Sequence, residues 1–353
     1  MDTASRRAFG WGIVGAGTIA RQFADDMCHV DGACIAAVHS RTKSSARALS
    51  THLDGVPVHD EFEAMLADAA VDAVYIATPN SLHAPQALMA LAAGKPVLVE
   101  KPLAMTSAEA REIADASARC GVFAMEALWS RFLPAVERVR ALLAAGAIGD
   151  IQRIEAELAF HKPEEPGNRF YDPALGGGAA RDLGVYPLSL ACLFFGLPIR
   201  TGGQWWKAGT GVDRRTVFDL EFAGGVNATL ACGFDRGGGN AFTIFGSKGA
   251  IRMAVPFLKA QRIAIFDSAV RDLPLVGAGA QARGTMAKVL ARLPLPGRTV
   301  EDFPFPGNGL QFQAMHVMQA VRAGGVQSPV MPLQDSIAVL EMIETVLSQP
   351  PAG

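Results

Sequence analysis

The chain has 353 residues, about twice the usual length of one domain, so two domains are expected. Half of the residues are hydrophobic and 19% are charged, a composition that supplies a sizeable core and excludes a disordered chain. The formal net charge is −2 and no run of like charges occurs, which argues against nucleic acid as a partner.

The cysteines and the apolar segments indicate the compartment. Five cysteines without CxxC spacing are interpreted as small buried side chains in a reducing environment, so neither disulfides nor a metal site is predicted. The N-terminal residues lack the apolar core of a signal peptide, and the longest apolar stretch is far shorter than the ~20 residues of a membrane span. We expect a cytoplasmic protein that does not bind membranes.

Strands and helices alternate in the first part of the chain, which predicts a parallel sheet covered on both faces. In chain order the expected elements are strand Phe9–Val14, helix Thr18–His29, strand Ala33–His39, helix Lys43–Leu53, strand Val56–Val58, strand Val71–Ala77, helix Ser81–Ala93, strand Pro96–Val99, helix Ser107–Arg119 and strand Val122–Met125.

The pattern changes after about Glu126, and β-rich runs separated by glycines predict an antiparallel sheet packed on helices. The expected elements are helix Pro134–Ala145, strand Ile151–Phe160, an apolar helix that ends at Phe195, several strands between Thr216 and Met253, and helices Leu310–Ala323 and Leu333–Leu347. Residues 259–308 show little periodicity and are interpreted as a long irregular excursion that could line a substrate site. The predicted α/β protein therefore has domains at 1–126 and 127–353.

A GxGxxA motif follows the first strand and opens the first helix. Gly15 allows a tight turn, and Gly17 lets the backbone approach a pyrophosphate. Thr18 and Ile19 begin the helix, whose unpaired N–H groups attract phosphates. The motif predicts a dinucleotide site.

The end of the second strand indicates which dinucleotide binds. An NAD site usually has an acidic residue here, whereas an NADP site has an arginine. The sequence has Ser40, Arg41 and Lys43 and no carboxylate, and a guanidinium can fork onto a 2′-phosphate. NADP(H) is favoured, and NAD(H) stays open.

Candidate acid–base groups lie in two motifs. Lys101 follows a buried strand, at the end where open α/β sheets bind ligands. Asp182 and Tyr186 are four residues apart and would share a helix face, although Pro187 predicts an irregular turn there. A capping aspartate and a core tyrosine are the structural alternatives.

The motifs and their order resemble the glucose–fructose oxidoreductase, inositol dehydrogenase and MocA family across nearly the whole chain. The matching segments are GAGTIA (15–20), ATPNSLHA (77–84), VEKPLA (99–104), GGGAARDLGVYPL (176–188), FGSKGAI (245–251) and SPVMPLQDS (328–336). The resemblance implies a Rossmann domain followed by an α+β domain, with a large, mostly antiparallel open sheet that often forms a dimer interface. It also implies that Lys101 works with Asp182 and Tyr186.

Tyrosine at position 186 and the segment MEALWSRFLP (125–134) are most similar to the dimeric dihydrodiol dehydrogenase and NADP-dependent D-xylose dehydrogenase branch. Further cofactor-site candidates are Thr78, Pro79, Asn80, His83, Glu100, Trp129 and Arg131, of which His83 is expected to support the cofactor loop. Candidate substrate contacts are His161, Arg169 and Tyr171. Trp129 and Arg131 could instead be packing at a domain junction, and His161 a surface histidine.

The sequence therefore predicts an NADP(H)-dependent dehydrogenase of a sugar or cyclic diol, and the resemblance implies a homodimer or a higher homo-oligomer. A phenol has a pKa of about 10 and is almost fully protonated at neutral pH, so it is a poor base there. The Lys101 ammonium would lower the pKa of Tyr186, so that Tyr186 can exchange the substrate proton. Two alternatives remain: a non-catalytic NADP-binding regulator of the same fold, and an NAD-dependent inositol or amino-sugar dehydrogenase.

Overall fold

The computed structural model describes residues 7–165, 167–269 and 296–352. The chain forms two compact units, the first from residues 1–129 and 306–337 and the second from residues 130–305 and 338–353. The buried carboxylate of Asp26 explains why residues from 306 onward join the first unit. It accepts hydrogen bonds from the backbone N–H groups of Asn308 (2.8 Å) and Leu310 (2.9 Å).

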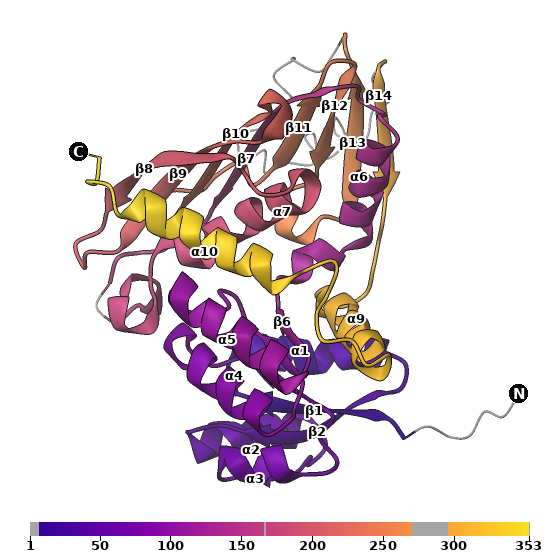
Figure 1. Ribbon diagram of the computed structural model, residues 1–353, viewed down its shortest axis with the longest axis vertical. Helices are drawn as coiled ribbons and strands as arrows, with labels where there is room; N and C mark the ends of the chain where they lie inside the picture. Colours follow the sequence, from indigo (N-terminus) through magenta and orange to yellow (C-terminus); the bar gives the residue numbers. More distant parts are fainter. Residues whose placement is uncertain (1–6, 166, 270–295, 353) are drawn as a thin grey trace, which may run out of the picture. The chain divides into compact units, whose positions relative to one another are not determined.

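The first unit contains a six-stranded parallel sheet with the strand order of a doubly wound dinucleotide-binding fold. In spatial order its strands are β3 (Val58–His59), β2 (Ala33–His39), β1 (Phe9–Val14), β4 (Ala73–Ile76), β5 (Val97–Val99) and β6 (Ala124–Glu126). Its helices are α1 (Thr18–Asp26), α2 (Lys43–His52), α3 (Phe62–Ala67), α4 (His83–Ala92), α5 (Ser107–Cys120) and α9 (Leu310–Arg322). Helix α4 packs against α5 and α1 against α9 (Figure 1). The predicted Rossmann fold is confirmed.

The second unit contains an eight-stranded sheet in which only β7 and β10 pair in parallel. In spatial order its strands are β14 (Arg298–Asp302), β13 (Arg262–Asp267), β12 (Gly249–Met253), β11 (Phe242–Gly246), β7 (Ile151–Ala159), β10 (Asn227–Gly233), β9 (Asp213–Glu221) and β8 (Arg200–Lys207). Its described α-helices are α6 (Pro134–Ala144) and α7 (Val185–Phe195), and α10 (Leu333–Leu347) contains the boundary between the units. The predicted mostly antiparallel sheet is confirmed.

The interpretation of residues 259–308 as irregular is wrong in part. Strands β13 and β14 lie in this range and pair with each other at the edge of the sheet, where Ile263 and Phe266 of β13 are buried. Residues 270–295 of that predicted excursion are outside the described part of the chain. Among the described helices, none is long and apolar enough to span a bilayer.

Candidate active site

The GxGxxA turn of the first unit has the geometry that a pyrophosphate requires. Gly15 has φ +103°, and a β-carbon there would lie 2.5 Å from the carbonyl oxygen of Ala77, so only glycine fits. The exposed Gly17 has no atom within 4 Å of its β-carbon position. Helix α1 starts at Thr18 without a side-chain cap, which leaves the amides of its first turn, including that of the half-buried Ile19, available to an anion. These residues fit a bound dinucleotide.

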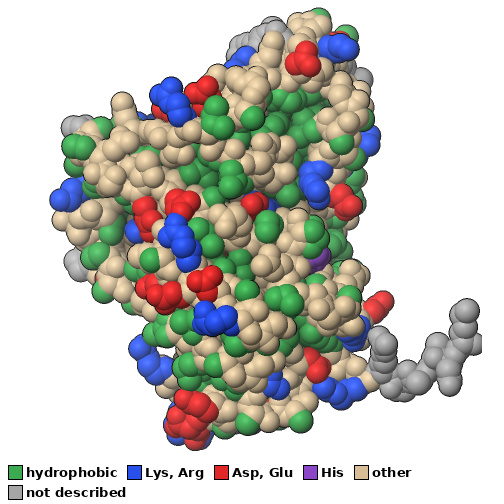
Figure 2. Space-filling view, viewed as in Figure 1, with side chains coloured by type: hydrophobic (Ala, Val, Ile, Leu, Met, Phe, Trp, Pro, Cys, Tyr) green, Lys and Arg blue, Asp and Glu red, His purple; other side chains and the backbone are tan. Residues whose placement is uncertain are grey.

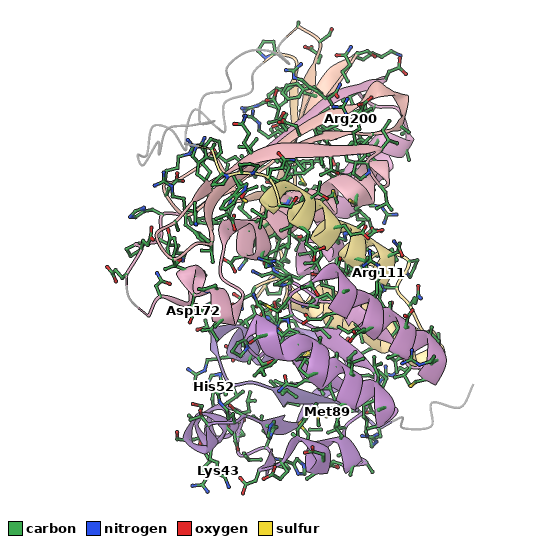
Figure 3. The ribbon with its side chains drawn as sticks, turned by 60° about the vertical axis from the view of Figure 1, so that its left-hand side comes forward. Lys43, His52, Met89, Arg111, Asp172 and Arg200 are labelled. Atoms are coloured by element: carbon green, nitrogen blue, oxygen red, sulfur yellow. The ribbon has the colours of Figure 1, made fainter. Side chains whose placement is uncertain are left out.

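The turn after β2 presents a cation that no described residue of the protein binds. Ser40 is half-buried, and Arg41 is exposed and makes no hydrogen bond or ion pair with any described residue. The ammonium of Lys43, labelled in Figure 3, lies 2.8 Å from a carboxylate oxygen of Asp60. Arg41 is therefore the cation of this turn that is available for a ligand phosphate.

Buried carboxylates hold the turn that carries Lys101. Glu100 is 6% exposed and accepts hydrogen bonds from the Tyr75 hydroxyl (2.6 Å) and the backbone N–H of Lys101 (3.1 Å). The buried Glu126 accepts from the backbone N–H of Leu103 (2.9 Å). Burial raises the pKa of Glu100, while the Tyr75 hydrogen bond and the Lys101 charge oppose that rise. Lys101 itself is half-exposed at the carboxyl end of β5.

His83 links this turn to the loop after β4. Its fully buried ring places Nδ1 2.8 Å from the carbonyl oxygen of Pro102 and Nε2 2.9 Å from that of Thr78. Burial lowers the pKa of His83, the hydrogen bonds to the carbonyls of Pro102 and Thr78 oppose this shift, and the charge of Lys101 adds to it. In the same loop Pro79 is exposed and Asn80 is half-buried. The geometry fits a supporting role for His83.

The second candidate motif forms a widened helical turn in the second unit. Residues Ala180–Gly184 are π-helical and lead directly into α7. Pro187 has no N–H for the carbonyl four residues earlier, and its ring would collide with that carbonyl in a regular helix, which explains the widening. The predicted irregularity is confirmed. Asp182 is half-exposed and Tyr186 is 7% exposed, and their separation places both on one side of this segment.

Arg131 lies in the second unit, against α7. Arg131 is 2% exposed, and its guanidinium donates to the hydroxyl of Ser189 (Nε to Oγ, 2.6 Å) and to the carbonyl of Ser189 (Nη2 to O, 2.7 Å). Because Ser189 follows Tyr186 by three residues, Arg131 fixes the helix that carries the tyrosine. Trp129, at 7% exposure, is the last residue of the first segment of the first unit. A cofactor role for Trp129 and Arg131 stays a prediction.

The three candidate substrate contacts differ in accessibility. His161 and Arg169 are exposed, and the Arg169 guanidinium carbon lies 4.2 Å from the ring centroid of Phe170. Tyr171 is 3% exposed, and its hydroxyl donates to the carbonyl oxygen of Lys162 (2.9 Å). Its hydroxyl is therefore already used within the protein, whereas the other two can reach a ligand.

On the face in Figure 2, basic and acidic side chains are interspersed. Several form exposed pairs of opposite charge, such as Arg138 with Glu301 and Arg262 with Asp302.

A glycine turn at the carboxyl end of a doubly wound sheet, with uncapped helix amides and a free arginine, defines a dinucleotide-binding protein. Comparison with known proteins identifies the class further. Residues 9–127 match the model of an oxidoreductase family with an NAD-binding Rossmann fold, and residues 136–252 match the GFO/IDH/MocA C-terminal domain. Trans-1,2-dihydrobenzene-1,2-diol dehydrogenases from Bos taurus and Homo sapiens are 32% and 30% identical to this chain, each alignment covering 96% of both proteins.

Solved structures agree with this classification. An aldose–aldose oxidoreductase from Caulobacter crescentus, complexed with glycerol, is 25% identical with a TM-score of 0.80, and the match covers 96% of each chain. A 3-ketoreductase from Actinomadura kijaniata, in complex with NADP and TDP-benzene, is 25% identical with a TM-score of 0.77 over 96% of this chain and 97% of the other. This chain belongs to the GFO/IDH/MocA oxidoreductase family, and it is an NAD(P)-dependent enzyme.

Proposed function

We propose that this enzyme is an NADP(H)-dependent dehydrogenase that acts on a secondary alcohol of a sugar or cyclic diol, or on the corresponding carbonyl. The observation that carries the cofactor choice is Arg41, exposed and unpaired among the described residues, on a turn without a carboxylate that would hold the ribose of NAD. The names of the dihydrodiol dehydrogenase relatives and of the aldose–aldose oxidoreductase support the substrate class.

Three side chains are proposed to carry out the acid–base chemistry. Bound NADP(H) would supply the hydride acceptor or donor. Tyr186 takes the proton of the substrate hydroxyl during oxidation and returns it during reduction. Lys101 provides the positive charge that favours the phenolate, and Asp182 orients the substrate or the lysine. The buried contacts of Glu100 and His83 hold the backbone on either side of Lys101, which supports this assignment.

The exposed side chains of His161 and Arg169 are proposed to contact substrate hydroxyls. The Tyr171 hydroxyl donates to the carbonyl oxygen of Lys162, so Tyr171 would affect substrate binding by stabilising the loop between these residues. A homodimer and a cytoplasmic location stay predictions, and light scattering of the purified protein tests the first of them.

The direct test incubates the protein with NADP⁺ or NAD⁺ and a panel of aldoses, inositols and cyclic trans-diols, and follows reduced-nicotinamide absorbance. Turnover with NADP⁺ and an aldose or diol supports the proposal. Cofactor binding without any turnover would favour the regulator of the same fold. NAD⁺-dependent turnover of an inositol or amino sugar would favour the other alternative.

A matched pair of variants tests the role of Arg41. R41A is expected to weaken NADPH binding about 10- to 100-fold, because the lost hydrogen bonds join two charged groups, and to leave NADH binding unchanged. K43A removes a cation from the same turn that is already paired with Asp60, so its effect is expected to stay below about threefold. Equal effects of the two variants would contradict the assignment.

A further inference from the structure

A buried aspartate lies beneath the turn that carries the proposed acid–base residues. Asp213, the first residue of β9, is 2% exposed. Its Oδ2 accepts a hydrogen bond from the backbone N–H of Ala180 (2.7 Å) and another from the Thr216 hydroxyl (2.7 Å). Ala180 is the first residue of the π-helical turn, so this carboxylate holds the beginning of the segment that leads to Asp182 and Tyr186.

Two glycines of this segment pack closely against neighbouring side chains. A β-carbon at Gly178 would overlap Oδ1 of Asp213, and Gly178 also has φ +119°, so the last glycine of GGG admits the carboxylate. At the other end of the turn, a β-carbon at Gly184 would lie 3.1 Å from the sulfur of Cys232. The turn therefore packs directly against strands β9 and β10.

Asp213 is more costly to bury than a core side chain of similar size. Burial raises its pKa, which the hydrogen bonds from Thr216 and Ala180 and the charge of Arg181 oppose. Oδ1 is buried and accepts no hydrogen bond from any other described residue. A buried carboxylate costs desolvation energy, and here one of its oxygens accepts no hydrogen bond to offset that cost. We therefore attribute the burial of Asp213 to the position of the turn whose backbone it binds.

We infer that Asp213 is a positioning residue, which holds the π-helical turn so that Asp182 and Tyr186 keep their catalytic placement. The residue acts through the backbone of Ala180 and need not touch substrate or cofactor. The inference rests on the proposed function for its catalytic consequence, but the anchoring of the turn can be measured separately.

The test compares two replacements of similar size. In D213N one amide oxygen can accept both hydrogen bonds that Oδ2 accepts now, so kcat is expected to stay within about threefold of the wild type. D213L has no acceptor and is expected to lower kcat about 10- to 100-fold, because a small displacement of a reacting group has an effect of this size. The KM for substrate and the Kd for NADPH are expected to change less than about threefold. Equal kcat values for D213N and D213L, whether both high or both low, would overturn the inference.

Two further variants complete the test. T216V removes one of the two donors without a change of side-chain shape and is expected to lower kcat less than D213L, which provides a test if D213L does not fold. D219N is the control on the same strand, since Asp219 is exposed and bonds Thr229. If T216V and D213L both keep a kcat as high as that of D219N, the inference is wrong.

Hydrogen exchange separates this inference from the proposed function. The peptide that spans residues 178–190 is expected to exchange faster in D213L than in D213N or D219N. If the wild type shows no dehydrogenase turnover, the proposed function fails, while this exchange result still decides whether Asp213 anchors the turn. Unchanged exchange in D213L would refute the anchoring itself.

Discussion

Replacing Arg131 by methionine tests how strongly the second unit depends on one buried guanidinium. The substitution keeps an unbranched apolar chain but leaves the hydroxyl and the carbonyl of Ser189 without the donors that now lie 2.6 and 2.7 Å away. A hydrogen bond to a charged group contributes about 1.5–3 kcal/mol, and a buried acceptor without a partner costs about 1–3 kcal/mol. We therefore expect R131M to lower the free energy of unfolding by about 3–5 kcal/mol, a large part of the total of a typical domain.

The matched control is R138M. Arg138 also makes two hydrogen bonds to one residue, the carboxylate of Glu301, but its side chain is 42% exposed. An exposed pair contributes little to stability because water screens its charges, so R138M is expected to change the free energy of unfolding far less than R131M does. Urea unfolding followed by tryptophan fluorescence measures both variants. A loss for R131M within about 1 kcal/mol of that for R138M would refute the reasoning.

Three further outcomes are expected. Y186F should lower kcat by about 100-fold or more and leave the Kd for NADPH unchanged, and full activity in this variant would remove Tyr186 from the mechanism. Because burial raises the pKa of Glu100, the folded state binds its proton more tightly than the unfolded state does. The stability of the wild type should therefore fall relative to that of E100Q as the pH rises above about 4.5. A stability difference that does not vary with pH would contradict this. G15A should unfold at lower urea concentration and weaken NADPH binding, since its β-carbon would meet the carbonyl of Ala77, whereas wild-type behaviour would show that the turn can relax.

The Rossmann sheet could be predicted from the sequence because its strands are short apolar runs that end in glycine or polar turns. Phe9–Val14 and Ala33–His39 have the predicted bounds. Helix α3 was not predicted, since six residues are too few to show a helical period. Strand β8 was not predicted because it begins with the polar, glycine-containing sequence RTGGQ.

For the candidate site too, local sequence motifs could be predicted and long-range contacts could not. Gly15, Lys101 and Tyr186 belong to local motifs, so the sequence can indicate them. The supports of those residues depend on contacts between distant parts of the chain, such as Arg131 with Ser189 and Asp213 with Ala180. A lone arginine and an aspartate after a glycine turn have no spacing that identifies such partners, and only the folded chain shows them.

The central claim is tested most directly with a cyclic trans-diol or aldose that carries deuterium on the carbon bearing the oxidised hydroxyl. The wild type is incubated with this substrate and NADP⁺, and the reduced cofactor is analysed by mass spectrometry. The account predicts one deuterium in the reduced nicotinamide, slower turnover than with the unlabelled substrate, and product formation by Y186F that is about 100-fold slower or more. Reduced cofactor without deuterium, or no reduced cofactor despite NADP⁺ binding, would contradict it.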